Sequence, residues 1–301
     1  MFTRRRAEHK KSSHTSSYAD GPPWFFTGRA FYQLHLVKAE IAKRFIPSEL
    51  KLVQAFGYTL GGFYLANYDS SPAGPFEELV VIAGIVWNPP TSCAWAARVL
   101  VNSLDACVHG KKEVGLPSTY AEFLQAGNFP LGSTNSELSV AHKVKPVHVD
   151  HDANGLKTGM DDNLTIRRNC ALKIVERVGT KRTPLCSISL PKQSLSGSGG
   201  SQRWSGPAIS MSLPSFSGRT TDQPKLLQYS CDLSCRISIV QPAFVMPLDS
   251  VPVNKVHVRT ESLDDANGDF EVISLLTSRP ILAFKFEEMA MKVKNPKVVT
   301  S

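Results

Sequence analysis

The segment from His109 to Ser118 brings together residue types that can do chemistry, and it reads His-Gly-Lys-Lys-Glu-Val-Gly-Leu-Pro-Ser. A lysine amine attacks a carbonyl only when it is deprotonated, and a free lysine is protonated at neutral pH. Taken alone, the segment is typical of a helix end with basic residues, followed by a Gly/Pro turn. The sequence around it has to decide between a structural and a chemical role.

A second polar group, between residues 142 and 161, has the residue types of a metal site. The stretch Asp150-x-Asp152-x-Asn154-Gly155 begins like an EF-hand calcium loop. An EF-hand needs flanking helices and usually ends on Glu, whereas Asp161 stands there and strands are expected on both sides, which favours a plain turn. Three nearby histidines lack helical spacing and are interpreted as surface residues: His142, His148 and His151. We predict no metal site.

Other catalytic and cofactor patterns are incomplete. The chain has no Gly-x-Ser-x-Gly elbow, and Gly197-Ser198-Gly199-Gly200 lacks the Gly-Lys-Ser/Thr ending of a phosphate loop. Cys231-x3-Cys235 is a poor zinc half-site, because no second Cys/His pair follows at ligand spacing. The sequence therefore predicts no cofactor. The six cysteines, in a chain without a secretory signal, indicate reduced and mostly buried thiols in an intracellular protein.

Long strands with few helices must position these residues. From Leu227 to Ile239 every odd position is apolar and every even one polar, which predicts a strand with one buried face that includes both cysteines. Glu78–Trp87 is apolar on both faces, as in a central strand. Five more strands are predicted, at Phe31–Val37, Tyr58–Tyr68, Ala94–Val101, Leu164–Val178 and Ile281–Met291.

Two short helices and one domain complete the prediction. The first helix is expected over Lys38–Phe45, and the second over residues 104–113, with Ser103 as its N-cap. Residues 1–20 are predicted to be a disordered basic tail and residues 21–295 a single domain with a flexible loop at 192–207. The Ser-rich tail is faintly like a plastid transit peptide, so cytosol and plastid both stay open.

Charge and hydropathy exclude two classes of partner. The net charge is +8, and residues 1–20 contribute five basic minus two acidic residues, or +3. The remaining charge is spread thinly, without the basic face and interleaved aromatics of a nucleic-acid binder, so no nucleic acid is expected. No apolar run is long enough for a transmembrane helix, since the longest, Leu79–Trp87, stops at Asn88-Pro89-Pro90.

The chain resembles the acetoacetate decarboxylase family. Arg29 in Gly28-Arg29-Ala30-Phe31-Tyr32 matches an arginine of that family, and Glu78, which follows Phe76-Glu77, matches an acid. In the segment Gly110-Lys111-Lys112…Leu116-Pro117-Ser118-Thr119, Lys111 replaces an arginine of the family. Ser118 replaces its Schiff-base lysine, and Thr119 that lysine's cationic neighbour. The resemblance implies a β-rich α+β fold: a closed or coiled antiparallel β-barrel (β-cone) with a few short helices.

The substitution at position 118 changes the expected chemistry. The decarboxylase lysine is activated by desolvation and an adjacent cation, and acetoacetate decarboxylase is itself the standard example. Serine cannot form an imine, and an alternative imine at Lys111 or Lys112 has little support. No catalytic residue is therefore predicted. The resemblance places Arg29, Glu78, Lys111 and Ser118 in a cavity, with aromatic residues of 24–32 and 56–68 as its lining.

A more specific resemblance covers Pro22 to about Phe123, including Ser71-Pro72-Ala73-Gly74-Pro75-Phe76 and the run to Asn102. It is to the neoxanthin-deficient family of plants, which implies a role in neoxanthin accumulation and thereby in abscisic acid biosynthesis. We expect an accessory protein that binds an apolar, oxygen-bearing small molecule such as a xanthophyll. The alternatives are an enzyme with Glu78 as acid or base, and a scaffold that works through its tail and loop. Oligomeric state stays open.

Overall fold

The computed structural model describes residues 18–88, 91–125, 171–191, 206–248 and 271–299. Several features predicted from the sequence lie outside these residues, so the structure does not bear on them. They are the first 17 residues of the tail, residues 192–205 of the loop, the first part of the strand Leu164–Val178, and the group between His142 and Asp161.

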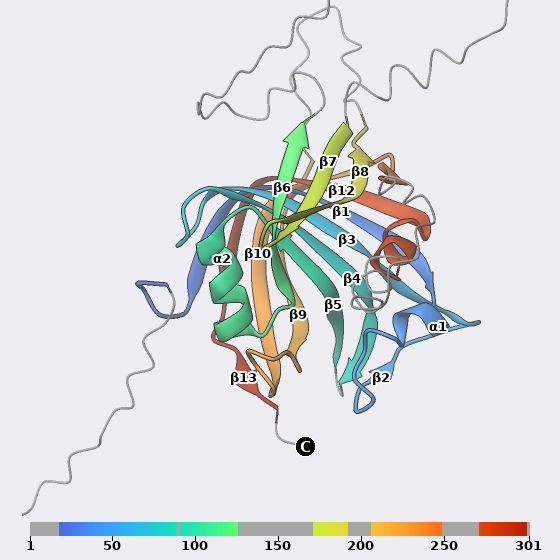
Figure 1. The fold of residues 1–301 in the computed structure, drawn as a ribbon, viewed down its shortest axis with the longest axis horizontal. Coiled ribbons are helices and arrows are strands. Elements are labelled where there is room, and N and C mark those ends of the chain that lie inside the picture. The colour runs from blue at the N-terminus through green and yellow to red at the C-terminus, as the bar shows by residue number, and fades with distance from the viewer. Residues whose placement is uncertain (1–17, 89–90, 126–170, 192–205, 249–270, 300–301) are drawn as a thin grey trace, which may run out of the picture.

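Strands dominate the described chain (Figure 1). The elements are β1 (Trp24–Lys38), α1 (Ala39–Ala42), β2 (Lys51–Leu52), β3 (Tyr58–Ser70), β4 (Phe76–Asn88), β5 (Thr91–Val101), α2 (Leu104–His109), the π-helical turn η1 (Gly110–Val114), β6 (Ser118–Gln125), β7 (Ala171–Val178), β8 (Lys181–Ser189), β9 (Ala208–Gly218), β10 (Leu226–Val240), β11 (Phe244–Pro247), β12 (Arg279–Val293) and β13 (Lys297–Val298). Residues 271–276 are also helical. The predicted β-rich fold with few helices is confirmed.

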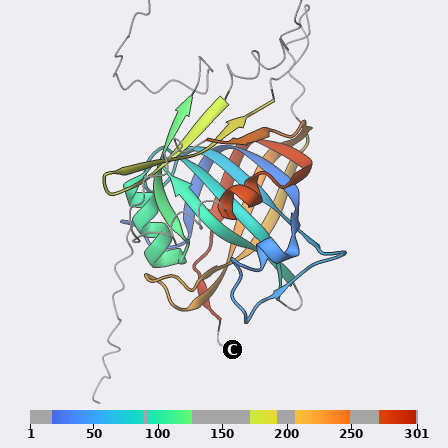
Figure 2. The same cartoon turned by 45° about the vertical axis from the view of Figure 1, so that its right-hand side comes forward.

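Seven strands close into a barrel. Their order is β5-β9-β10-β12-β1-β3-β4, and β4 pairs again with β5 to complete the ring. A second arm, β6-β7-β8-β11, branches from β5 and rises past the end of the barrel (Figure 2). Closure leaves the ring without a free edge and gives it an enclosed interior.

The branch point differs from the purely antiparallel sheet that the sequence predicted. One edge of β5 pairs in parallel with β9 at Ala94–Trp95, and then in parallel with β6 at Val99–Val101. The helical crossover of α2 and η1 explains the second pairing, because it returns the chain to the start of β6 in the direction of β5. The remaining pairings within the described sheet are antiparallel.

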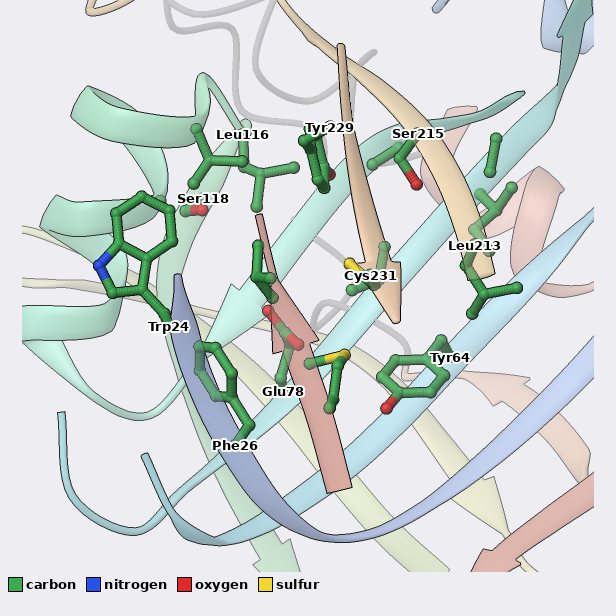
Figure 3. A pocket seen from close by; sticks show the side chains of 18 of the residues that line it. Trp24, Phe26, Tyr64, Glu78, Leu116, Ser118, Leu213, Ser215, Tyr229 and Cys231 are labelled. Atoms are coloured by element: carbon green, nitrogen blue, oxygen red, sulfur yellow. The ribbon is translucent and has the colours of Figure 1, made fainter. Parts of the chain in front are cut away.

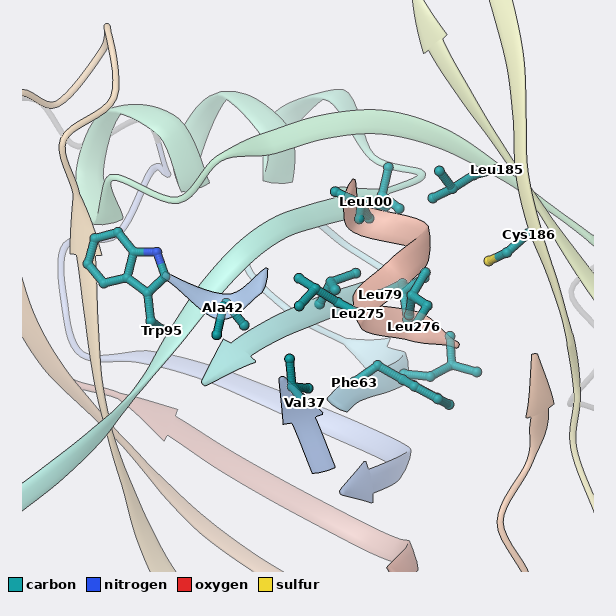
Figure 4. Packing of buried hydrophobic residues seen from close by; sticks show 14 of the residues in the cluster. Val37, Ala42, Phe63, Leu79, Trp95, Leu100, Leu185, Cys186, Leu275 and Leu276 are labelled. Atoms are coloured by element: carbon teal, nitrogen blue, oxygen red, sulfur yellow. The ribbon is translucent and has the colours of Figure 1, made fainter. Parts of the chain in front are cut away.

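Two apolar cores lie on the two sides of the barrel wall. One fills the barrel interior around Trp24, Phe26 and Phe286. The other lies between the outer wall, the branch and the helical residues 271–276; it includes Leu79, Phe63, Ile174, Cys186, Leu275 and Leu276 (Figure 4). Strand β4 serves both cores, because Leu79 and Val81 are fully buried on its outer face while Val80 and Ile82 face inwards. Its prediction as a central strand is confirmed.

The local predictions hold with a few exceptions. The Ser103 side chain accepts a hydrogen bond from the Ala106 amide at 3.3 Å, as expected of an N-cap. The first helix is shorter than predicted, since Lys38 still belongs to β1. The C-terminal strand is longer than predicted and is not the last one, since β13 follows it. In β10 the alternation fails at Ile239, which is 73% exposed near the strand end.

None of the described helices combines the length and apolar character needed to cross a membrane.

Candidate functional site

A cavity of about 320 Å³ occupies the barrel interior (Figure 3). Its walls come from the inward faces of the barrel strands, and α2 and η1 close one side. The lining follows β4 from Glu78 to Ile85, which corresponds to about 23 Å of extended strand. Most of the lining is apolar or aromatic; the predicted aromatic lining is confirmed for Trp24, Phe26, Tyr32, Tyr64 and Tyr68.

Glu78 is the carboxyl group of this cavity. It faces inwards with Val80 and Ile82, which follow it at alternate positions of β4 and also line the cavity. Its register partners, Ala66 of β3 and Ala30 of β1, have small side chains. The Tyr68 hydroxyl donates a hydrogen bond to Glu78 Oε2 at 2.8 Å. Burial raises the pKa of Glu78 to about 7, against a smaller lowering by that hydrogen bond. Near neutral pH the group therefore exists in both protonation states.

The other polar groups around Glu78 are neutral. Burial, and then the charge of Glu78, raises the pKa of Tyr64 far above its usual range, so its hydroxyl stays protonated and donates to Met289 Sδ at 3.1 Å. Burial likewise raises the pKa of the Cys231 thiol to about 12, with Glu78 as the second cause. A thiol with such a pKa is a poor nucleophile, because the reactive form is the thiolate.

Ser118 lines the same cavity from the first position of β6, and its side chain is buried. It packs against Gly110 of η1 so closely that a Cβ atom built at Gly110 would lie 2.5 Å from Ser118 Oγ. The Cys107 thiol donates to the Ser118 carbonyl oxygen at 3.5 Å. Among the described residues that line the cavity there is no lysine and no arginine. The serine that replaces the family's lysine thus faces a cavity whose described walls carry no amine.

Arg29 and Lys111 lie elsewhere. Arg29 is on the opposite face of β1, where its guanidinium donates to Asn67 Oδ1 at 3.4 Å, and Asn67 in turn pairs with Glu77. Lys111 is half-buried in η1 and does not line the cavity; its charge acts on Cys107, where it opposes the rise in pKa caused by burial. The structure brings Glu78 and Ser118 into one cavity and leaves Arg29 and Lys111 outside it.

An aromatic cluster at one end of the cavity was missed by the sequence analysis. The His109 ring stacks on Tyr18 with centroids 3.5 Å apart, and Trp24 meets it edge-on at 4.4 Å. Burial lowers the pKa of His109 to about 4, so the ring is neutral at physiological pH. Trp24 Nε1 donates a hydrogen bond to the Asp20 carbonyl oxygen at 3.1 Å, and this bond fixes the position of the indole. Tyr18 and Trp24 lie close together at the start of the described chain, whereas His109 comes from the end of α2, so no spacing pattern connects the three.

Comparison with solved structures supports the fold. No protein-family model matches the chain. A structure of acetoacetate decarboxylase superposes with a TM-score of 0.50 at 9% identity, covering 97% of this chain and 95% of that one. An acetoacetate decarboxylase-like enzyme from Sphingomonas wittichii RW1 gives a TM-score of 0.50 at 12% identity, over 98% and 100% of the two chains. At such low identity the likeness concerns the fold alone, and it agrees with the closed barrel.

Similarity at the level of sequence is much higher. Protein Neoxanthin-deficient 1 of Oryza sativa subsp. japonica is 47% identical, over 96% of this chain and 93% of its own length. The proteins of the same name from Solanum lycopersicum and Arabidopsis thaliana are 44% and 46% identical, over 98% and 97% of this chain and 98% of their own lengths. The chain therefore belongs to the Neoxanthin-deficient 1 family of plant proteins.

Proposed function

We propose that the barrel cavity binds one oxygenated end of an apolar, oxygen-bearing molecule of the xanthophyll class. In this proposal the chain supports neoxanthin accumulation, and thereby abscisic acid biosynthesis, as an accessory ligand-binding protein, and residues 21–295 act as one domain. The observation that carries the proposal is the composition of the cavity: an apolar lining with one buried carboxyl group and no amine among its described residues. The names of the rice, tomato and Arabidopsis relatives supply the biological context.

The carboxyl group suits a ligand oxygen. Below its pKa of about 7, Glu78 is a hydrogen-bond donor that can pair with a ring hydroxyl, ketone or epoxide. The Tyr68 hydroxyl already donates to one of its oxygens, which leaves the other oxygen for the ligand. The surrounding apolar side chains supply the burial energy, at about 25 cal/mol per Å² of apolar surface removed from water. Such a site recognises an oxygen within a hydrocarbon framework.

The serine at position 118 supports a role other than that of the decarboxylases. An imine forms when an amine attacks a ketone and water leaves, and an alcohol cannot take that route. Ser118 is buried against Gly110, and its backbone carbonyl accepts a hydrogen bond from the Cys107 thiol. No described lysine faces the cavity. In this account, position 118 helps to shape the cavity.

A second candidate is an acid–base enzyme, and the pKa of Glu78 is the observation that favours it. Conversion of violaxanthin to neoxanthin breaks an epoxide C–O bond, protonates the oxygen and removes a carbon-bound proton to form an allene, so it needs an acid and a base. A group with a pKa of about 7 can play either part at neutral pH. The neighbouring groups are poor second proton-transfer groups at neutral pH: burial raises the pKa of Tyr64 and Tyr68 far above their usual range, which makes them weak acids, and lowers that of His109 to about 4, which makes it a weak base.

Glu78→Gln and Glu77→Gln form a matched pair that separates the two candidates. Glu77 is adjacent in sequence but points away from the cavity, where Asn102 Nδ2 donates to it at 3.0 Å. Violaxanthin or neoxanthin added to the purified protein should quench its tryptophan fluorescence. Neither compound should be converted to a product. Glu78→Gln should retain binding, because its amide donates as the protonated acid does. Glu78→Leu should weaken binding about tenfold by the loss of one hydrogen bond, and Glu77→Gln should leave it unchanged. Turnover that only Glu78→Gln abolishes would establish the enzyme instead; no binding at all would refute both candidates.

A further inference from the structure

The turn that leads into β3 places an aromatic ring in water. Ala55 and Tyr58 exchange two backbone hydrogen bonds of 2.9 Å, so Phe56 and Gly57 are the two central residues of a tight hairpin. Both have positive φ, at 51° for Phe56 and 80° for Gly57. Asn-Gly is the preferred pair for such turns, and a bulky residue is strained in the left-handed region. Phe56 therefore occupies a position that its backbone disfavours, with its side chain fully exposed.

The turn is held in place by its neighbours and is surrounded by other exposed apolar side chains. The Ala39 amide at the start of α1 donates to the Gly57 carbonyl at 2.8 Å. The exposed neighbours are Val53, Tyr58 and Trp87, which together with Phe56 form the aromatic tip. The loop between β2 and β3 projects from the side of the barrel in both views (Figures 1 and 2). Apolar side chains that protrude on a fixed backbone are typical of an interaction surface.

Backbone pairings connect the aromatic tip to the end of the cavity. The Val53 amide donates to the Ile85 carbonyl, and Trp87 pairs with Ser92 across β4 and β5. Ile85 and Ser92 both line the cavity. Trp87 follows Ile85 by two residues, so it faces the same side of β4 just beyond the last lining residue of that strand. The tip thus lies at the end of the cavity that is farther from Glu78 along β4.

The charge around the aromatic tip suits an anionic lipid surface. The sequence holds no carboxylate between Leu50 and Tyr68 or between Leu79 and Ala97, and exposed Lys43 and Lys51 flank the tip. The carboxylates just before these stretches, Glu40 and Glu49, form ion pairs with Lys38 at 3.9 Å and with Arg219 at 3.0 Å. Aromatic rings with adjacent lysines are the side chains that settle at a membrane interface, where the rings enter the headgroup region and the ammonium groups meet lipid phosphates. A single ring on a tight turn inserts between lipids without requiring a complementary protein groove.

We infer that the aromatic tip docks the protein on a lipid bilayer that contains anionic lipid, with Phe56 as the inserting side chain. Docking in this way brings the adjacent cavity end to the bilayer, where water-insoluble molecules dissolve. That consequence rests on the proposed function, because it concerns the ligand; the docking itself does not.

Flotation with vesicles of phosphatidylcholine and phosphatidylglycerol tests the docking with ligand-free, full-length protein. The wild type should float, and Phe56→Asn should lower the partition coefficient about tenfold, as expected when an inserted phenyl ring is lost. The melting temperature of Phe56→Asn should equal or exceed that of the wild type, because asparagine suits positive φ. Phe56→Trp should retain flotation.

Phe25→Asn is the matched control. Phe25 is 60% exposed and lies at the start of β1, whose other end pairs with Tyr58, so it is about 40 Å along the strand from the tip. This variant should float like the wild type. The inference is overturned if the wild type stays with the aqueous phase, if Phe56→Asn floats equally well, or if the tip instead makes a dimer that Phe56→Asn dissociates in analytical ultracentrifugation. Violaxanthin binding in detergent, measured in parallel, tests the proposed function separately.

Discussion

Glu78→Gln should remove a pH dependence from the stability of the fold. The carboxyl faces the interior of the barrel, and its pKa is about 7 in the folded protein against 4.5 for an ordinary glutamate. A glutamine preserves the size of the side chain and an oxygen that can accept from the Tyr68 hydroxyl, but it never ionises. The substitution therefore imitates the protonated acid at every pH.

The magnitude follows from the difference between the two pKa values. A separation of about 2.5 units corresponds to about 3 kcal/mol between the two protonation states. Because the folded-state pKa is the raised one, the folded protein binds the proton more tightly, and this contribution to stability is complete below about pH 4.5. It declines as the pH rises and is lost above about pH 7. At high pH the folded wild type holds a buried charge, and the variant does not.

Urea unfolding of both proteins at about pH 4 and about pH 8 measures the effect. The free energy of unfolding of the variant minus that of the wild type should be about 3 kcal/mol larger at the higher pH, because the wild type alone loses stability there. Taking this double difference cancels the titration of the other groups. An equal effect of the substitution at both pH values would show that Glu78 is ionised and solvated in the folded protein, and the description of the cavity as a desolvated site would be wrong.

Three further predictions concern Ser118, its neighbour and the outer wall. Gly110→Ala should destabilise the protein by about 1–3 kcal/mol, because its Cβ would lie 2.5 Å from Ser118 Oγ, and Ser118→Ala should restore most of that loss in a double-mutant cycle followed by thermal unfolding. Glu176→Ala should cost about 3–5 kcal/mol in urea unfolding, because it removes a carboxylate, only 5% exposed, to which the Arg98 guanidinium donates at 2.7 Å and 2.8 Å. A cost below about 1 kcal/mol would argue against a tight pair. Borohydride added with a β-diketone should yield no covalent adduct by mass spectrometry, and a trapped lysine would reverse the interpretation of Ser118.

Local patterns predicted the elements well, because local forces determine them. The alternation of β10, the double-sided apolar character of β4 and the Ser103 cap are each readable within a few residues. The parallel partners of β5 could not be read in this way. They depend on where α2 and η1 return the chain and on a contact with β9, more than a hundred residues away in sequence.

The prediction of the candidate site was incomplete, because the site too depends on how distant parts of the chain are arranged. In a barrel with a core on each side, the alternation along β1 identifies two buried faces without saying which one faces the cavity. The resemblance to the decarboxylase family assigned Arg29 to the cavity, although it lies on the face of Asn67 and Glu77. The stack of Tyr18, Trp24 and His109 depends on the segment before β1 meeting the end of α2, about 85 residues later in the sequence, and only Trp24 had an aromatic context that pointed to the cavity.

Native mass spectrometry of the full-length chain with a xanthophyll tests the central claim most directly, with Ala96→Phe as the comparison. Ala96 lines the cavity from β5, and a phenyl ring there would fill part of its 320 Å³. The wild type should retain one xanthophyll per chain, and the variant should retain none while melting as a folded protein. A wild type that binds nothing, or a variant that binds as well as the wild type, would contradict the assignment of this cavity as the ligand site.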